Sequence, residues 1–126
     1  MRPRDRQYTA THEWAKSEAD LVTVGITDFA VERLGDLTFL KLLKPSTTIG
    51  CDEPFGEIES VKAVAELYAP VAGTIVEVNE AAPDALDLVA QDPFEAGWLV
   101  RIRPSSPQRS AKLLSAEEYE KTLESA

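Results

Sequence analysis

The chain has few of the residues that build disulfides, metal centres and cysteine active sites. Its 126 residues include one cysteine, Cys51, and one histidine, His12. A single cysteine cannot form an intrachain disulfide, which is consistent with a reducing compartment, and the pair leaves no His/Cys cluster for structural zinc. Cys51 precedes Asp52 and Glu53, and acidic neighbours disfavour the thiolate that a cysteine protease needs. No metal site and no cysteine chemistry are therefore expected.

Long apolar runs and basic charge are also scarce. No run of about 18 apolar residues occurs, so no transmembrane helix and no membrane association are expected. With 13 basic and 22 acidic residues the formal net charge is −9, which is the wrong sign for a nucleic-acid-binding protein. Such a surface suits simple solubility and also partners with basic patches, and the charge alone does not choose between them.

The basic start, residues 1–6, has no apolar segment of the kind that a secretory signal contains. A cytoplasmic protein is therefore expected, with a processed mitochondrial form as the alternative. The length predicts a single domain over residues 1–126, with its core at about 8–103.

Turn residues divide the chain into short β-segments and leave few helical patterns. A helix is predicted at 29–34, because Thr27 is a suitable N-cap and Gly35 a suitable stop. Ser115 and Glu118 have the spacing of a capping box, which predicts a C-terminal helix at about 115–123. Residues 104–107 are expected to be a linker. Strands are predicted at 21–26, 37–42, 55–60, 66–68, 74–78 and 98–103.

Short strands at regular spacing with Gly/Pro turns predict a mainly β fold, an antiparallel sandwich or barrel. Within it Trp14 and Trp98 are expected in the core, since large aromatic side chains dominate burial. Gly73 follows Pro70 closely and is expected at a tight corner.

Lys62 lies between two predicted strands, at the tip of an expected β-hairpin. A hairpin tip projects a side chain from a rigid base, which suits covalent attachment of a cofactor. Val61 and Ala63 beside it are stiff or small, and Glu59 and Glu66 add negative charge. A lysine alone is most often just a solvated surface residue, so the wider context decides.

That context resembles the glycine cleavage system H protein family. Residues 59–63, Glu-Ser-Val-Lys-Ala, followed by Leu-Tyr-Ala-Pro-Val-Ala-Gly at 67–73, resemble its lipoylation hairpin. The resemblance covers roughly residues 8–123 in the family's order. Further matches are Tyr8 with His12-Glu13-Trp14, the segments 24–30 and 34–36, Asp92-Pro93-Phe94 with Gly97-Trp98-Leu99, and Leu113, Leu114 and Tyr119 in the C-terminal helix.

The resemblance implies a lipoyl-domain-like barrel-sandwich fold and lipoate in amide linkage to Lys62. It implies that the lipoate-attaching enzyme recognises the hairpin residues Glu59, Ser60, Val61 and Ala63.

The resemblance also implies a surface cleft that holds the loaded arm, with contacts from Glu13, Thr11 and Glu66. A simpler interpretation is that His12 and Glu13 only cap a turn. His12 is not expected to act as a general base, because no nucleophile partner is evident.

A carrier of this family is a shuttle substrate and not an enzyme. It takes an aminomethyl group of glycine from a pyridoxal-phosphate glycine decarboxylase to a folate-dependent aminomethyltransferase, and dihydrolipoamide dehydrogenase reoxidises the arm. These enzymes and the lipoate-attaching enzyme are the partners implied, with the carrier itself expected as a monomer.

Two departures from the family pattern put the choice of partner in question. The loop at 43–50 is altered, and Ala90 stands where the family commonly has asparagine. The alternative is an H-protein-like lipoate carrier of a heterodisulfide-reductase-like sulfur oxidation system. A biotin carrier would have methionines in place of Val61 and Ala63, and an unmodified scaffold protein is the remaining possibility.

Overall fold

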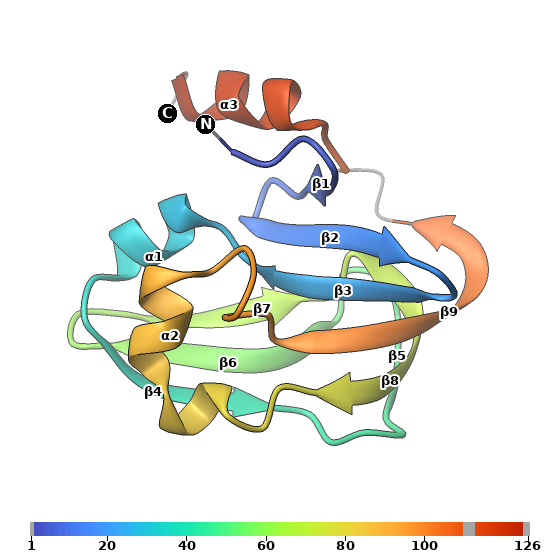
Figure 1. Ribbon diagram of the computed structural model, residues 1–126, viewed down its shortest axis with the longest axis horizontal. Helices are drawn as coiled ribbons and strands as arrows, with labels where there is room; N and C mark the ends of the chain where they lie inside the picture. The colour runs from blue at the N-terminus through green and yellow to red at the C-terminus, as the bar shows by residue number, and fades with distance from the viewer. Residues whose placement is uncertain (1, 110–112, 125–126) are drawn as a thin grey trace.

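The computed structural model describes residues 2–109 and 113–124. Over these residues the backbone forms short strands and a few helices (Figure 1). The strands are β1 (Gln7–Tyr8), β2 (Glu13–Glu18), β3 (Leu21–Ile26), β4 (Leu37–Leu42), β5 (Thr48–Ile49), β6 (Pro54–Ser60), β7 (Val64–Tyr68), β8 (Val71–Val78) and β9 (Val100–Arg109). The helices are α1 (Asp28–Leu34), the 3-10 helix η1 (Ala82–Asp84), α2 (Leu86–Gln91) and α3 (Ala116–Glu124).

Two antiparallel sheets form the body of the molecule. One has the strand order β1-β2-β3-β9-β8-β5 and the other has β4-β6-β7. Residues from both sheets share one hydrophobic core, with Phe55 and Ile58 from β6 meeting Val24, Ile75 and Ile102 from the larger sheet. In β3, for example, the alternate residues Val22, Val24 and Ile26 enter this core, which is how two half-buried sheets pack into a sandwich. The predicted mainly β, antiparallel sandwich is confirmed.

The predicted helix ends are confirmed by their hydrogen bonds. The Thr27 hydroxyl accepts a bond from the Ala30 amide at 3.2 Å, and Gly35 ends α1 at φ 79°. The Ser115 hydroxyl accepts from the Glu118 amide, while the Glu118 carboxylate accepts from the Ser115 amide, as a capping box requires. Helix α3 packs through Ala116 and Tyr119 on a second cluster with Tyr8 and Trp14.

Residues 104–107 are not a linker, because they continue β9 to Arg109. Strand β3 pairs with β9 only as far as Ile102, whereas β8 pairs with it further, opposite Pro104 and Arg109. Among the residues that the structure describes, no strand pairs with that side of β9 beyond Ile102, and a proline is tolerated at such an edge.

One helix was not predicted, and two further expectations need correction. Helix α2 was not predicted, and it covers the end of the sandwich next to α1 (Figure 1). Gly73 is not at a corner but inside β8, where a Cβ atom would stand 2.2 Å from the carbonyl oxygen of Arg103. Trp14 is buried as expected, whereas Trp98 is only half-buried, with the Arg101 guanidinium 3.9 Å from its ring centroid.

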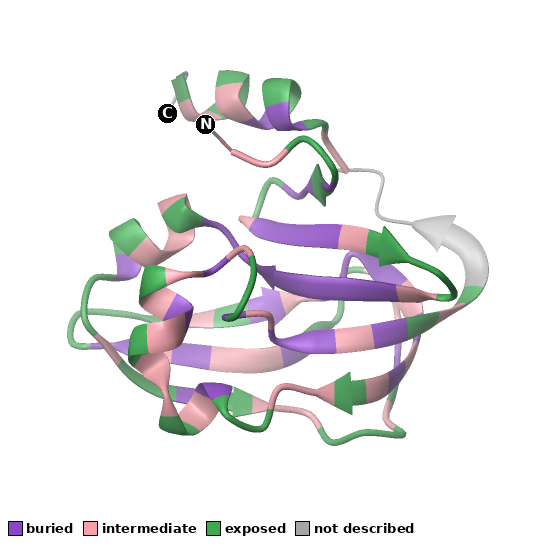
Figure 2. Cartoon of the chain, viewed as in Figure 1, coloured by how far each residue is buried: buried purple, intermediate pink, exposed green. Residues whose placement is uncertain are grey.

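Burial follows this arrangement (Figure 2). Buried residues run along β2 and β3, and the turn between β6 and β7 is mostly exposed at the edge of the molecule. Among the helices that the structure describes, none is long and apolar enough to cross a membrane.

Candidate functional site

Lys62 is exposed in the three-residue turn that joins β6 to β7. The turn is closed by the Ser60 amide, which donates to the Ala63 carbonyl at 2.8 Å. The Ser60 hydroxyl accepts from the Ala63 amide at 3.1 Å, and the Val61 amide donates to the Asp36 carbonyl at 3.1 Å. The backbone around the lysine is thus fixed from both sides, while its side chain is free to leave the surface.

The Lys62 side chain lies over the end of α1. Its Cε atom is 3.5 Å from the place where a Cβ of Gly35 would stand. The positive φ of Gly35 turns the chain sharply after Leu34 and suits a residue without a side chain. The lysine stem can therefore rest on bare backbone next to the hairpin.

A cleft of about 250 Å³ opens beside Lys62, between α1 and the hairpin. Its lining includes Ala63, the residue after Lys62, and Leu34, the residue before Gly35. Most of its wall is apolar, with polar groups at a few places. The residues that line it are Thr11, His12, Glu13, Ile26, Ala30, Arg33, Leu34, Ile58, Ala63, Ala65, Glu66 and Leu67.

Glu13 is the buried acid of this cleft, with 1% of its surface exposed. One carboxylate oxygen accepts hydrogen bonds from the Thr9 hydroxyl at 2.6 Å and from the Thr11 hydroxyl, and the other accepts from the Tyr68 amide at 3.2 Å. Burial raises the pKa of Glu13, although these hydrogen bonds act in the opposite direction. Its carboxylate forms no ion pair with any basic side chain of residues 2–105 or 113–124, whose side chains the structure describes.

A buried carboxylate without a basic partner is costly, and a cation placed beside it would relieve that cost. Glu13 lines the same cleft as Ala63, the residue after Lys62. A cationic group on an arm attached to Lys62 would therefore have its counter-charge at Glu13.

His12 stands between Thr11 and Glu13 with its backbone at φ 75°, a conformation that few residues with a side chain adopt. Its Nδ1 atom is 2.7 Å from the Tyr119 hydroxyl, which is 2.8 Å from the Thr27 hydroxyl. Burial lowers the pKa of His12, and the charges of Arg33 and Arg2 lower it further. The surroundings of His12 thus favour its neutral form, and its ring forms part of the cleft wall.

The structure places the three predicted residues Thr11, Glu13 and Glu66 along the same cleft, where Thr11 is hydrogen-bonded to Glu13. Glu66 is exposed at the rim, and its carboxylate accepts from the Tyr68 hydroxyl at 3.3 Å. It pairs across the sheet with Glu57, so the two side chains share the outer face.

The predicted hairpin residues also differ in accessibility. Val61 and Ala63 are exposed and Glu59 is half-buried on the outer face, whereas Ser60 is buried and holds the turn from within.

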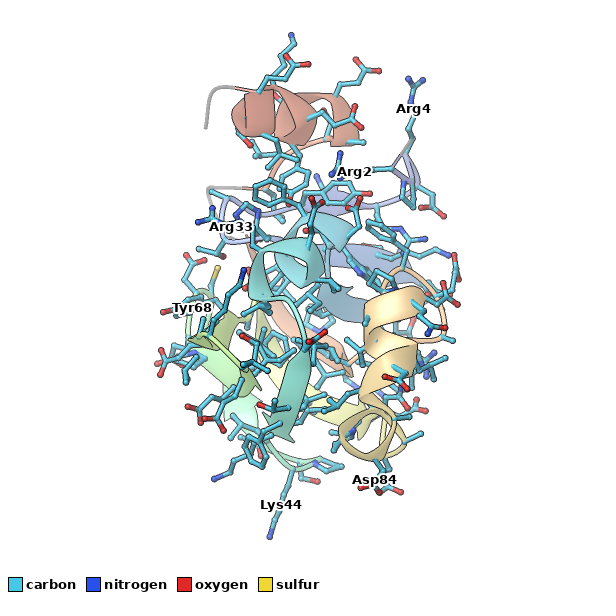
Figure 3. The ribbon with its side chains drawn as sticks, turned by 90° about the vertical axis from the view of Figure 1, so that its left-hand side faces the viewer. Arg2, Arg4, Arg33, Lys44, Tyr68 and Asp84 are labelled. Atoms are coloured by element: carbon cyan, nitrogen blue, oxygen red, sulfur yellow. The ribbon has the colours of Figure 1, made fainter. Side chains whose placement is uncertain are left out.

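Four residues of the site were not found from the sequence: Thr9, Tyr68, Arg33 and Tyr119. Thr9 and Tyr68 hold the Glu13 carboxylate, and Arg33 lines the cleft. Figure 3 shows Arg33, from α1, above Tyr68, from β7, on the same side of the molecule. Tyr119 reaches His12 across 107 positions of sequence, and no local pattern signals such a contact.

An exposed lysine on a hairpin tip, beside a mostly apolar cleft in a β-sandwich, defines a covalent carrier protein of the lipoyl-domain type. The comparisons with known proteins agree. The family model described as Glycine cleavage H-protein matches residues 6–126. The glycine cleavage system H protein of Bacillus subtilis is 46% identical over 118 residues, which cover 94% of this chain and 93% of that protein. That of Rubrobacter xylanophilus is 49% identical over 122 residues, covering 97% and 94%.

The fold comparison gives the same result. The crystal structure of a glycine cleavage system H protein from Mycobacterium marinum matches with a TM-score of 0.91 and 43% identity, covering 98% of this chain and 99% of that chain. The chain belongs to the glycine cleavage H-protein family. The predicted family, the lipoyl carrier role in glycine cleavage and lipoate as covalent cofactor are thereby confirmed. No observation favours the sulfur-oxidation or biotin alternatives.

Proposed function

We propose that Lys62 is the lysine that carries lipoate, and that residues 1–126 act as one carrier domain. The observation that carries this proposal is the position of Lys62. The Lys62 side chain projects from a fixed turn, packs on Gly35 and lies beside a cleft. The buried acid of this cleft, Glu13, has no basic partner among the described side chains.

The residues present fit a lipoyl group. The cleft next to Lys62 is lined mainly by aliphatic side chains, among them Leu34, Ile58 and Leu67, which suit a hydrocarbon chain. When attached, the lipoyl group supplies the two sulfur atoms that take up and release the aminomethyl group.

The chain's own residues would bind, orient and shield that cargo. The Glu13 carboxylate is placed to accept hydrogen bonds from the cationic end of an aminomethyl group, and Thr9 and Thr11 hold the carboxylate in position. The aliphatic walls keep water away from the same region. Glu66 contributes at the rim of the cleft, where its negative charge attracts the cationic group. Glu66 does this without a contact to Glu13.

We infer that the chain is not itself an enzyme. The ring of His12, the one histidine, has the Tyr119 hydroxyl as its hydrogen-bond partner, which argues against a role as general base. Chemistry is left to the partners, which by family membership include the system's decarboxylase and aminomethyltransferase. The proposal includes two further partners, dihydrolipoamide dehydrogenase and a lipoate-attaching enzyme. It also includes a monomeric state and a cytoplasmic location. The location is supported by the bacterial relatives and the single cysteine.

A Lys62→Arg variant tests the assignment. Arginine keeps the charge and the length but cannot form the amide, so we expect a folded protein that gains no lipoyl mass and supports no glycine cleavage in a reconstituted assay. The control is Lys41→Arg on β4, which should be lipoylated and active. Full activity of Lys62→Arg, or lipoyl mass on another lysine, would refute the proposal.

A further inference from the structure

Exposed large hydrophobic side chains gather around Lys62. Within residues 2–105 and 113–124, whose side chains the structure describes, only Phe39, Val61 and Val64 are large, hydrophobic and exposed, at 44%, 76% and 60%. Val61 precedes the lysine and Val64 begins β7 just after the turn. Single exposed hydrophobic residues are common, but a cluster on one face indicates a contact surface.

The strand register places these side chains together. Phe39 on β4 pairs with Glu59 on β6, and Glu59 pairs in turn with Val64 on β7. Directly paired residues project from the same face of a sheet, so Phe39, Glu59 and Val64 form one row across the outer face. The next row, Lys41, Glu57 and Glu66, is charged. The first row thus has two apolar side chains and one carboxylate, and Val61 is exposed in the turn that follows β6; Phe39, Glu59 and Val64 are here called the Phe39 row.

The position of the row relative to Lys62 indicates which partner it meets. An enzyme that builds the amide must bring its active site onto the lysine nitrogen itself. There the neutral Nζ amine attacks the carbonyl carbon of an activated lipoyl donor, such as an acyl adenylate. The amide bond forms, the leaving group departs with the electron pair of its broken bond, and the amine proton passes to solvent. Partners that use the finished arm meet its far end, away from the tip.

We propose that the Phe39 row is the docking surface for the enzyme that attaches lipoate to Lys62. This inference rests on the proposed function. The row fits a partner with an apolar surface next to a basic side chain, the apolar part covering Phe39 and Val64 and the basic group pairing with Glu59. Phe39 comes from a strand remote in sequence from the hairpin, so recognition involves the folded sheet and not the Glu-Ser-Val-Lys-Ala segment alone.

The test uses unlipoylated full-length protein and a purified lipoate-attaching enzyme that modifies the wild type. We expect the double variant Phe39→Ser, Val64→Thr to raise the KM for the carrier about tenfold, with kcat unchanged, because buried aromatic contacts dominate such interfaces. Lys41→Ser, two residues from Phe39 on the same strand and face, is the control and should leave KM unchanged. Thermal unfolding of each variant should match the wild type, since all three side chains are exposed.

An unchanged KM for attachment in the double variant would overturn the proposal. If, after forced lipoylation with excess enzyme, the same variant then shows a raised KM at the decarboxylase, the row belongs to that partner instead. The mass of the wild-type peptide around Lys62 keeps these outcomes separate from a failure of the proposed function, because unmodified Lys62 would refute the assignment of the lysine itself.

Discussion

At the scale of single residues, the cleft contains a buried acid, Glu13, whose ionised form lowers the stability of the folded protein. The Glu13 carboxylate is buried, and its hydrogen-bond donors are hydroxyl groups and one backbone amide, none of them charged. Hydrogen bonds from neutral groups offset only part of the desolvation of a charge, which is why the pKa of Glu13 is raised. A residue held in this way is costly until a cation arrives, and this indicates a binding function.

The variant Glu13→Gln separates the two effects. Because the pKa is raised, the folded protein binds the Glu13 proton more tightly than the unfolded chain does. Wild-type stability from this group is therefore present at low pH and is lost as pH rises through the raised pKa. Above that window we expect Glu13→Gln to be more stable than the wild type by about 1 kcal/mol, measured by urea unfolding at several pH values.

The same variant should bind the cargo less well. We expect the loaded carrier to lose its aminomethyl group to water about tenfold faster in Glu13→Gln, since a charge-assisted hydrogen bond is lost. Glu66→Gln is the matched control at the rim and should change this rate much less, because its carboxylate is exposed. Equal effects of the two substitutions would show that general negative charge, and not the Glu13 contact, protects the cargo.

At the scale of elements, the β6–β7 turn depends on the hydroxyl of Ser60. It accepts from the Ala63 amide at 3.1 Å and lies 3.4 Å from the Lys62 amide. We expect Ser60→Ala to lower the free energy of unfolding by about 1 kcal/mol and to speed amide hydrogen exchange at Ala63. Ser17→Ala, at an exposed position of β2, should do neither. Unchanged exchange at Ala63 would mean that the backbone bond from Ser60 to Ala63 holds the turn alone.

The elements that could be predicted from the sequence are those with a local signal. The helix α1 lies between Thr27 and Gly35, and α3 begins with the capping box of Ser115 and Glu118. Helix α2 has no side-chain cap, and its six residues are too few to show a helical period, so it was missed. The prolines at 104 and 107 predicted a break, whereas the free side of β9 tolerates them.

The site was predictable to a similar extent. Lys62, Glu13 and Thr11 lie in short segments that match the family pattern. The hydrogen-bond partners of Glu13 and His12 from elsewhere in the chain are Tyr68 and Tyr119, which are brought to them by sheet packing and by the docking of α3. Such contacts depend on the tertiary fold and leave no spacing in the sequence.

At the scale of the whole molecule, charge is distributed unevenly. Several arginines near the N-terminus are paired with acids, as in Arg2 with Asp28 at 2.8 Å and Arg6 with Glu95 at 3.2 Å. Around the hairpin, Glu57, Glu59 and Glu66 lie on the outer face of the smaller sheet, two of them in the row that contains Lys41. These three carboxylates outweigh the single positive charge of Lys41, so the face is negative and can steer a basic partner toward the Lys62 end.

Steering of this kind predicts a dependence on salt. Exposed charges are screened over about 10 Å at 0.1 M ionic strength, and screening slows association more than it affects bound contacts. Between about 0.02 and 0.3 M salt we expect the KM of the lipoate-attaching enzyme for the unlipoylated carrier to rise several-fold while kcat stays constant. A triple variant, Glu57→Gln, Glu59→Gln and Glu66→Gln, should begin with a higher KM and show a flatter salt dependence. If the wild type and the triple variant respond equally to salt, the acidic face does not guide the partner, and the net charge serves solubility alone.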